Sequence, residues 1–232
     1  MSSRFYAIGD VHGRSDLLAC MIQFVENHAR ITGQEPRVIF LGDIVDRGPD
    51  SRGAIDIVLD TIDRWPNSRF ILGNHDEMFL KSVTDPSNTR VLQNWCYNGG
   101  ATTLASYFGP HDEFFPDEVA SIGREFPRHI ELIKNASIIE TVGRYAFVHA
   151  GIDPKTSLFE QKTKNCLWIR DEFLDHIGPL SHTIVHGHTI IEGSRPIVTE
   201  NRISLDTGAY CSASSPLRPN EGLHERRISG SS

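Results

Sequence analysis

Three short motifs in this chain place Asp, His and Asn side chains directly after apolar segments. They occupy residues 9–13 (GDVHG), 42–48 (GDIVDRG) and 73–76 (GNHD). Carboxylate, imidazole and amide groups are hard or borderline ligands for divalent metal ions. If the apolar segments are neighbouring parallel strands, their carboxyl ends meet at one edge of a sheet and bring the motifs together. The pattern therefore predicts a site for a pair of divalent metal ions.

Two later motifs each place a histidine after another apolar segment. Residues 147–151 (FVHAG) contain His149, and residues 186–189 (HGHT) contain His188. Phosphoryl transfer requires charge neutralisation, an in-line nucleophile and a proton for the leaving group, and the motifs offer candidates for each. Mixed His, Asp and Asn ligation suits Mn, Fe or Zn better than Ca or Mg. Each motif alone is commonly a turn or a structural histidine, but chance is a poor explanation for the whole ordered set.

The elements that position the first three motifs are predicted from hydrophobic patterns. Residues 5–8, 37–41 and 69–72 are short apolar segments, which predict β-strands. Apolar residues between them recur at helical spacing, which predicts one helix with Ser15 as its N-cap and a second that begins at residues 50–51. This β-α-β-α-β order is typical of a parallel sheet with right-handed crossovers.

The rest of the chain divides into a helical middle and a second group of strands. Residues 77–135 are mostly helical in pattern and interrupted by prolines, so we expect a cap-like segment there. Later strands are predicted as two hairpins and one separate strand: 138–142 with 144–148, 183–185, and 197–199 with 202–205. We predict one domain over residues 1–210 and a flexible tail over residues 211–232.

The composition limits the class of protein. A chain of 232 residues is long enough for one substantial core. The net charge of −7 argues against a broad nucleic-acid or membrane surface, although bound metals can still attract an anionic substrate. Four scattered cysteines without a CxxC pair are typical of free thiols in a reducing compartment. Because no signal-peptide core or apolar run of about 20 residues is present, a cytoplasmic protein is expected.

The ordered motifs GDxHG, GDxxDRG, GNH(E/D), HAG and GHT resemble those of the calcineurin-like metallophosphoesterases. The resemblance is to the phosphoprotein phosphatase branch with its small bacterial and phage members, and it covers roughly residues 4–210. It implies an α/β fold: an αβ-sandwich with two mixed central sheets, flanked by helices and carrying a mostly helical cap segment. Residues 1–210 would then be the catalytic domain.

The resemblance also implies two divalent metal ions, with Mn²⁺ expected in vitro and Fe or Zn as alternatives. Six residues match the metal ligands of the family: Asp10 and His12 for the first ion, Asp43 as a bridge, and Asn74, His149 and His188 for the second. A hydroxide that bridges the ions, acidified by both, would attack phosphorus in one step without a phosphoenzyme.

Four further residues match catalytic positions of the family. His75 would protonate the leaving alkoxide, and Asp46 would orient its imidazole. Arg47 and Arg170 would bind the oxygens of the transferring phosphoryl group through their guanidinium groups.

Other polar residues near the motifs have more than one explanation. We interpret His186 as a strand-end residue rather than a metal ligand. Asn98-Gly99-Gly100 resembles a family segment near the cleft, although a simple turn explains it nearly as well. Asp206 could support the metal ligands by hydrogen bonding or occupy a turn. Asp76 stands where many protein phosphatases have Glu, so packing or substrate choice could differ.

Three functions remain open from the sequence. The first is a serine/threonine phosphoprotein phosphatase that acts on phosphorylated protein or small phosphoesters, with no nucleic-acid or membrane partner. The second is a symmetrical diadenosine tetraphosphate hydrolase. The GNHD motif favours that activity, whereas Asp46 and the context of the WIRDEF and GHT motifs favour the first. The third is a non-catalytic scaffold, which predicts lost ligands, yet all six are present. The oligomeric state is not predicted.

Overall fold

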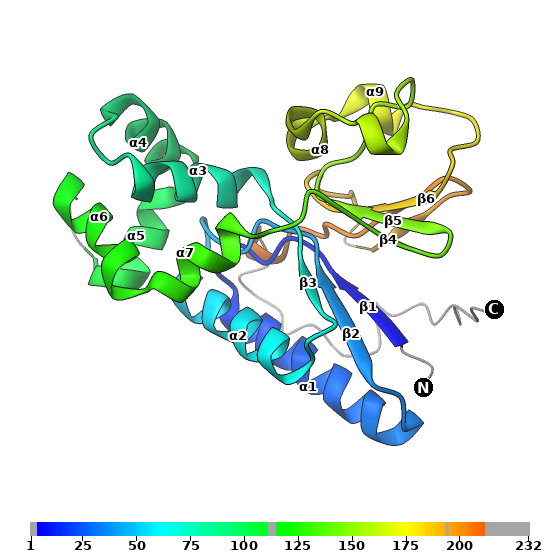
Figure 1. Ribbon diagram of the computed structural model, residues 1–232, viewed down its shortest axis with the longest axis horizontal. Helices are drawn as coiled ribbons and strands as arrows, with labels where there is room; N and C mark the ends of the chain where they lie inside the picture. The colour runs from blue at the N-terminus through cyan, green and yellow to red at the C-terminus, as the bar shows by residue number, and fades with distance from the viewer. Residues whose placement is uncertain (1–3, 111–114, 194, 212–232) are drawn as a thin grey trace.

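The computed structural model describes residues 4–110, 115–193 and 195–211. Its first sheet consists of β1 (Arg4–Ile8), β2 (Pro36–Phe40) and β3 (Arg69–Phe70), in that order and all parallel. The crossovers are α1 (Ser15–Thr32) and α2 (Ser51–Arg64), which lie together on one face of this sheet (Figure 1). The predicted β-α-β-α-β unit is therefore confirmed.

Three local expectations need correction. We expected both sheets to be mixed, but the described strands of the first are only parallel, because each is joined to the next by a helical crossover rather than a hairpin. The third strand is shorter than predicted, since Ile71 forms only an isolated bridge to Ser137. Ser15 is not an N-cap: helix α1 begins at Ser15, whose hydroxyl donates to Asp50 instead.

The second sheet is mixed and follows the order β4-β5-β6-β8-β7. Its strands are β4 (Ile139–Val142), β5 (Tyr145–Val148), β6 (Thr183–His186), β7 (Ile197–Val198) and β8 (Arg202–Ser204). The pairs β4–β5 and β7–β8 are antiparallel, as the two predicted hairpins require, while β6 is parallel to both of its neighbours.

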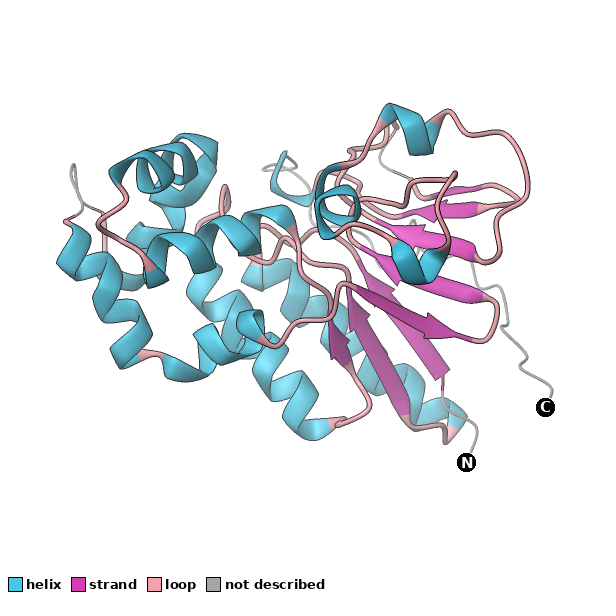
Figure 2. Ribbon diagram, turned by 45° about the horizontal axis from the view of Figure 1, so that its top comes forward, coloured by secondary structure: helices cyan, strands magenta, loops and turns pink. Residues whose placement is uncertain are grey.

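Side chains that alternate between the two faces of the strands divide the core into layers. Figure 2 shows the strands and the helices between which these layers lie. In β2, Val38 and Phe40 pack with the residues of α1 and α2, whereas Ile39 packs against Phe147 of the second sheet together with Leu41, which directly follows the strand. The other face of the second sheet is covered by α8 (Thr163–Trp168) and α9 (Asp171–Leu174). The molecule is thus an αβ-sandwich with helices outside both sheets, as expected.

The middle of the chain forms a group of helices beside the sandwich (Figure 1). They are α3 (Asn74–Thr84), α4 (Thr89–Trp95), a π-helical turn (Cys96–Gly100), α5 (Ala101–Phe108), α6 (Pro116–Glu125) and α7 (Pro127–Lys134). Pro116 and Pro127 begin α6 and α7, where a missing N–H is tolerated. Two 3₁₀ turns, Leu158–Glu160 and Ala209–Cys211, complete the described elements.

Two further expectations concern the flexible tail and membrane-spanning segments. Nearly all of the predicted tail, residues 212–232, lies outside the described residues. Among the helices that the structure describes, none combines the length and the apolar character that crossing a membrane requires.

Candidate metal centre

The loops that follow β1 and β2 are joined by their backbones. The N–H groups of Val11 and His12 donate to the carbonyl of Asp43 at 3.1 and 2.9 Å, and Gly13 donates to Ile44 at 2.9 Å. These bonds bring the first two motifs side by side, as the sequence predicted from strands that end at a common edge.

Backbone strain is concentrated in these loops. In the described part of the chain, all non-glycine residues with a positive φ angle belong to the predicted site: His12, Asp43, Asp46, Arg47 and His188. Such conformations are unfavourable for residues with a Cβ and are held only where the surrounding contacts impose them. The fold therefore holds these side chains in fixed directions.

Asp76 explains how the second and third motifs are held together. Its carboxylate caps α3 by accepting from the N–H of Gly73 at 3.0 Å, and it also accepts from the N–H groups of Asp43 at 2.7 Å and Ile44 at 3.0 Å. Burial raises the pKa of Asp76 to about 7. The GNHD motif thus ends in a residue that supports the loop carrying Asp43.

Polar atoms converge around the ring of His149. Its Nδ1 donates to the carbonyl of Leu41 at 2.8 Å, so its Nε2 carries a lone pair. Three atoms face that nitrogen: Asn74 Oδ1 at 2.9 Å, His188 Nδ1 at 3.2 Å and Asp43 Oδ1 at 3.4 Å. A lone pair, an amide oxygen and a carboxylate oxygen repel one another unless a cation or proton lies between them. The arrangement is therefore suited to a cation.

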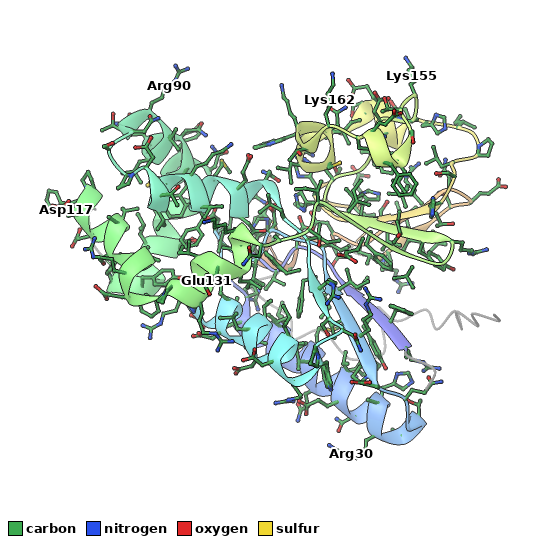
Figure 3. All side chains as sticks on the ribbon, in the orientation of Figure 1. Arg30, Arg90, Asp117, Glu131, Lys155 and Lys162 are labelled. Carbon is green, nitrogen blue, oxygen red and sulfur yellow. The ribbon has the colours of Figure 1, made fainter. Side chains whose placement is uncertain are left out.

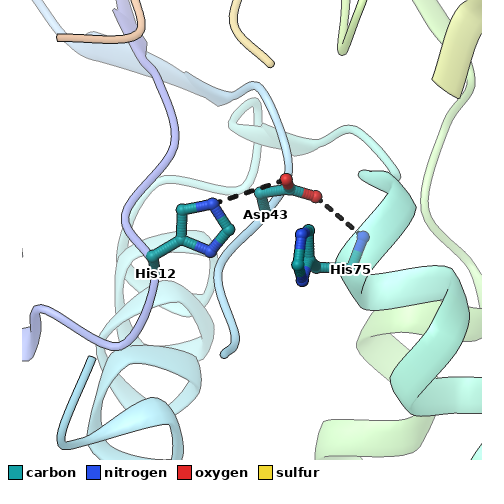
Figure 4. Close-up of side chains that lie close together, drawn as sticks. All are labelled: His12, Asp43 and His75. Carbon is teal, nitrogen blue, oxygen red and sulfur yellow. Dashed lines mark hydrogen bonds and ion pairs between the residues drawn. The ribbon is translucent and has the colours of Figure 1, made fainter. Parts of the chain in front are cut away.

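A second group lies on the other side of Asp43 (Figure 4). Ligand atoms of His12, Asp43 and His75 lie within 4.8 Å of one another. His12 donates from Nδ1 to the carbonyl of Val45 at 2.8 Å, and its Nε2 lies 3.6 Å from Asp43 Oδ2. The two carboxylate oxygens of Asp43 therefore face different histidines, as a residue between two ions would.

Asp10 is the predicted ligand whose place differs most from expectation. It is buried, but among the described residues it joins neither group of converging ligand atoms. Its carboxylate accepts instead from the backbone N–H of His188, at 3.0 and 3.1 Å. A Cβ at Gly187 would overlap this carboxylate, so glycine is required before His188. Asp10 is thus adjacent to the centre through the GHT loop.

Burial and charge at this centre fit a pair of divalent cations. Burial, together with neighbouring carboxylates, raises the pKa values of Asp10 and Asp43 well above their usual range. Burial also lowers the pKa values of His12 and His149 well below theirs, which leaves neutral imidazoles. Cations would offset the cost of the buried carboxylates, and neutral imidazoles are the form that binds metal. His188 Nε2 is buried without a partner in the described region.

A hydrogen-bonded chain fixes the imidazole of His75. Its Nδ1 donates to Asp46 at 2.7 Å. The Asp46 carboxylate is held in turn by the indole N–H of Trp95 at 2.9 and 3.0 Å and by the hydroxyl of Thr103 at 2.7 Å. Trp95, Thr103 and Asp46 are fully buried. Trp95 and Thr103 were not predicted from the sequence, although Trp95 lies just before the Asn-Gly-Gly segment.

Arg47 bridges the histidines and is held from two sides. Its guanidinium donates to Nε2 of His12 at 2.8 Å and of His75 at 2.9 Å. The guanidinium carbon lies 4.7 Å from the ring centre of Tyr210, a cation–π contact that the sequence did not indicate. The Arg47 N–H donates to Gly99, where a Cβ would collide with Arg47. Gly99 of the Asn-Gly-Gly segment thus contacts Arg47, whereas the exposed Asn98 side chain donates to the carbonyl of Asn94 at 2.7 Å.

The remaining candidates lie at the rim or behind the centre. Arg170 is exposed and donates to Thr189 at 3.3 Å, and its charge adds to burial in lowering the pKa of His188 to about 3. The ring of His186 accepts from Ser204 at 2.7 Å and donates to the carbonyl of Gly187 at 3.0 Å. Both of its ring nitrogens are thus occupied away from the ligand groups. Asp206 is buried and accepts from Gly208 at 2.9 Å.

Comparisons with known proteins show what this chain is similar to. The family model described as calcineurin-like phosphoesterase matches residues 3–212. Serine/threonine-protein phosphatase 1 of Salmonella typhimurium is 28% identical over 210 residues, which cover 88% of this chain and 86% of that protein. An asymmetrical bis(5'-nucleosyl)-tetraphosphatase of Geobacillus thermodenitrificans is also 28% identical, over 87% of this chain and 84% of that protein.

A solved structure shares the fold. A protein serine/threonine phosphatase from Saccharomyces cerevisiae superimposes with a TM-score of 0.55 over 87% of this chain and 66% of that chain. At a sequence identity of 17%, this similarity shows a shared fold only.

Proposed function

Because the chain belongs to the calcineurin-like phosphoesterase family, we propose that it is a metal-dependent phosphomonoesterase that acts as a serine/threonine phosphoprotein phosphatase. The observation that carries this proposal is the His75–Asp46 pair beside the converging ligand atoms. A serine or threonine alkoxide is a poor leaving group that must be protonated as it departs. A positioned imidazole supplies that proton.

The six predicted ligands would hold two divalent ions. Asp43 would contact both, Asn74, His149 and His188 would hold one, and Asp10 and His12 would hold the other. Asp10 would have to turn its carboxylate from the His188 backbone toward the ion. When bound, the ions supply charge neutralisation for the phosphoryl oxygens and acidify the attacking water.

The side chains around the ions would divide the remaining work. His75 would hold a proton on Nε2 for the departing oxygen, while Asp46 receives the hydrogen bond from Nδ1 and fixes the ring. Arg47 would move its guanidinium from the two imidazoles to the phosphoryl oxygens, and Arg170 would approach them from the rim. Trp95 and Thr103 would keep the Asp46 carboxylate in place, so that the acid stays aligned.

Hydrolysis of diadenosine tetraphosphate is the second candidate. The GNHD motif favours symmetrical cleavage, whereas the similar bis(5'-nucleosyl)-tetraphosphatase of Geobacillus thermodenitrificans is an asymmetrical enzyme. In that reaction a nucleotide phosphate leaves, and it is a much better leaving group than an alkoxide. A general acid held by three buried partners would then add little to the rate of hydrolysis. The His75–Asp46–Trp95 arrangement therefore favours the monoesterase.

A comparison of substrates tests the proposal. Purified protein with Mn²⁺ is given a phosphoserine peptide and, separately, diadenosine tetraphosphate. We expect kcat/KM for the peptide to be higher by roughly tenfold or more. Faster cleavage of the dinucleotide would overturn the protein phosphatase assignment. Formation of ADP alone, or of ATP with AMP, would then identify symmetrical or asymmetrical cleavage. Absence of turnover on both would favour the scaffold.

A further inference from the structure

A groove of about 660 Å³ lies between α8 and the helices α3 and α4. In Figure 1, α3 and α4 lie in the upper left of the molecule and α8 in the upper right. One wall contains Met78 and Lys81 of α3 with Arg90 and Val91 of α4, and the other contains Lys164, Leu167 and Trp168 of α8. Nothing in the proposed chemistry uses this groove.

Both walls of the groove begin at the metal centre. Helix α3 starts at Asn74, so Met78 lies one turn further and Lys81 about 10 Å along the helix, at about 1.5 Å per residue. On the opposite wall, the ring of Trp168 lies 6.1 Å from the ring of His188. A substrate bound through its phosphate at the centre would therefore extend into the groove.

The groove is cationic although the chain carries a net charge of −7. It is lined by three cations, Lys81, Arg90 and Lys164, and by a single acid, Glu77, which pairs with Lys81 at 2.9 Å. Neither Arg90 nor Lys164 has an acidic partner among the residues that the structure describes. Two exposed cations on facing walls are thus available to an anionic ligand.

The walls of the groove also offer apolar contact. Met78 and Leu167 on these walls are buried, Val91 is partly buried, and Trp168 is 43% exposed. Unpaired cations around an apolar strip complement an extended peptide with acidic side chains. The adjacent phosphates of a dinucleotide are linked directly, so much of their charge would stay at the metal centre rather than reach α4.

We propose that this groove binds the peptide segment next to the phosphorylated residue and selects acidic side chains in it. The inference rests on the proposed phosphatase function. An extended peptide advances about 3.3 Å per residue, so a distance of about 10 Å corresponds to about three residues. An acidic side chain that meets Lys81 would therefore lie about three residues from the phosphoserine, and Arg90 and Lys164 line the same groove.

Two phosphoserine peptides test the selection. One carries Glu at the positions two to four residues on either side of the phosphoserine, and the other carries Ala there. We expect a preference of roughly threefold to tenfold in kcat/KM for the Glu peptide, expressed mainly in KM, because exposed charge pairs are individually weak. In the variant Arg90→Glu with Lys164→Glu, that preference should disappear or reverse. Turnover of p-nitrophenyl phosphate, which carries no acidic peptide side chain to contact Arg90 or Lys164, should not change.

A matched control variant distinguishes the effect of the groove cations from the effect of net charge. Arg30→Glu with Lys155→Glu changes the net charge equally at two exposed cations outside the groove (Figure 3). This control should retain the preference for the Glu peptide, and both double variants should unfold at similar temperatures.

Each alternative result has a distinct meaning. If the natural protein hydrolyses both peptides equally, or the groove variant keeps its preference, the inference is wrong while the phosphatase function stands. If only diadenosine tetraphosphate is hydrolysed, the proposed function itself is wrong. If the groove variant raises KM for that dinucleotide alone, the groove belongs to a nucleotide.

Discussion

Asp43→Asn is expected to reduce turnover of phosphoesters by roughly a thousandfold or more, because it removes the carboxylate between the two groups of ligand atoms. One Asp43 oxygen lies 3.4 Å from His149 Nε2 and the other 3.6 Å from His12 Nε2. An amide has nearly the same shape but lacks the charge that two cations require. The measurement is kcat/KM for p-nitrophenyl phosphate at saturating Mn²⁺, with metal content of the dialysed protein.

The expected loss of turnover in Asp43→Asn would not be explained by unfolding of the variant. Asp43 is 2% exposed, and burial raises the pKa of its carboxyl well above the usual range. A neutral amide removes this unfavourable buried charge in the metal-free protein. We therefore expect metal-free Asp43→Asn to unfold at the same temperature as the natural protein or higher. Asp63→Asn, a surface control, should leave turnover unchanged. Retention of turnover within tenfold by Asp43→Asn would rule out Asp43 as the shared ligand.

His75→Asn is expected to lose roughly a hundredfold to ten-thousandfold in turnover of substrates with poor leaving groups, which is the range for loss of a general acid. The loss should be much smaller with p-nitrophenyl phosphate, since p-nitrophenolate departs without a proton. The reason is geometric: Nδ1 of His75 is fixed by Asp46 at 2.7 Å, which leaves Nε2 for the leaving oxygen. The measurement compares kcat for phenyl phosphate and p-nitrophenyl phosphate in both proteins.

The metal content of the variant distinguishes a general-acid role of His75 from a role as a metal ligand. His75 lies within 4.8 Å of His12 and Asp43 in the same group of potential ligand atoms, so a direct metal contact is the competing role. We expect His75→Asn to bind as much Mn²⁺ as the natural protein. If the variant loses metal and both substrates slow equally, His75 is a ligand and the general acid lies elsewhere.

The sequence predicts most of the fold and of the site, because each motif follows its own strand. Parallel strands end at one edge, so the order of motifs was enough to bring His12, Asp43 and Asn74 together. The later motifs supplied His149 and His188 by the same rule. Local patterns were less reliable at element ends, where Ser15 bonds to Asp50 across 35 positions instead of capping its own helix.

The supporting residues could not be predicted in this way. Trp95 and Thr103 hold Asp46 from 49 and 57 positions away in sequence. Tyr210 reaches Arg47 from the opposite end of the chain. Such contacts depend on how the helical group packs against the loops, which hydrophobic periodicity does not specify. The groove could not be predicted from the sequence either, because its cations are spread over three helices of an acidic chain.

Titration of the metal-free protein with Mn²⁺ tests the central claim most directly. Bound metal and hydrolysis of p-nitrophenyl phosphate are followed together, from an excess of chelator to saturation. The dinuclear centre predicts no turnover in chelator, and full turnover only as binding approaches two ions per chain. Undiminished hydrolysis in chelator, or saturation of both metal binding and activity at one ion per chain, would contradict it.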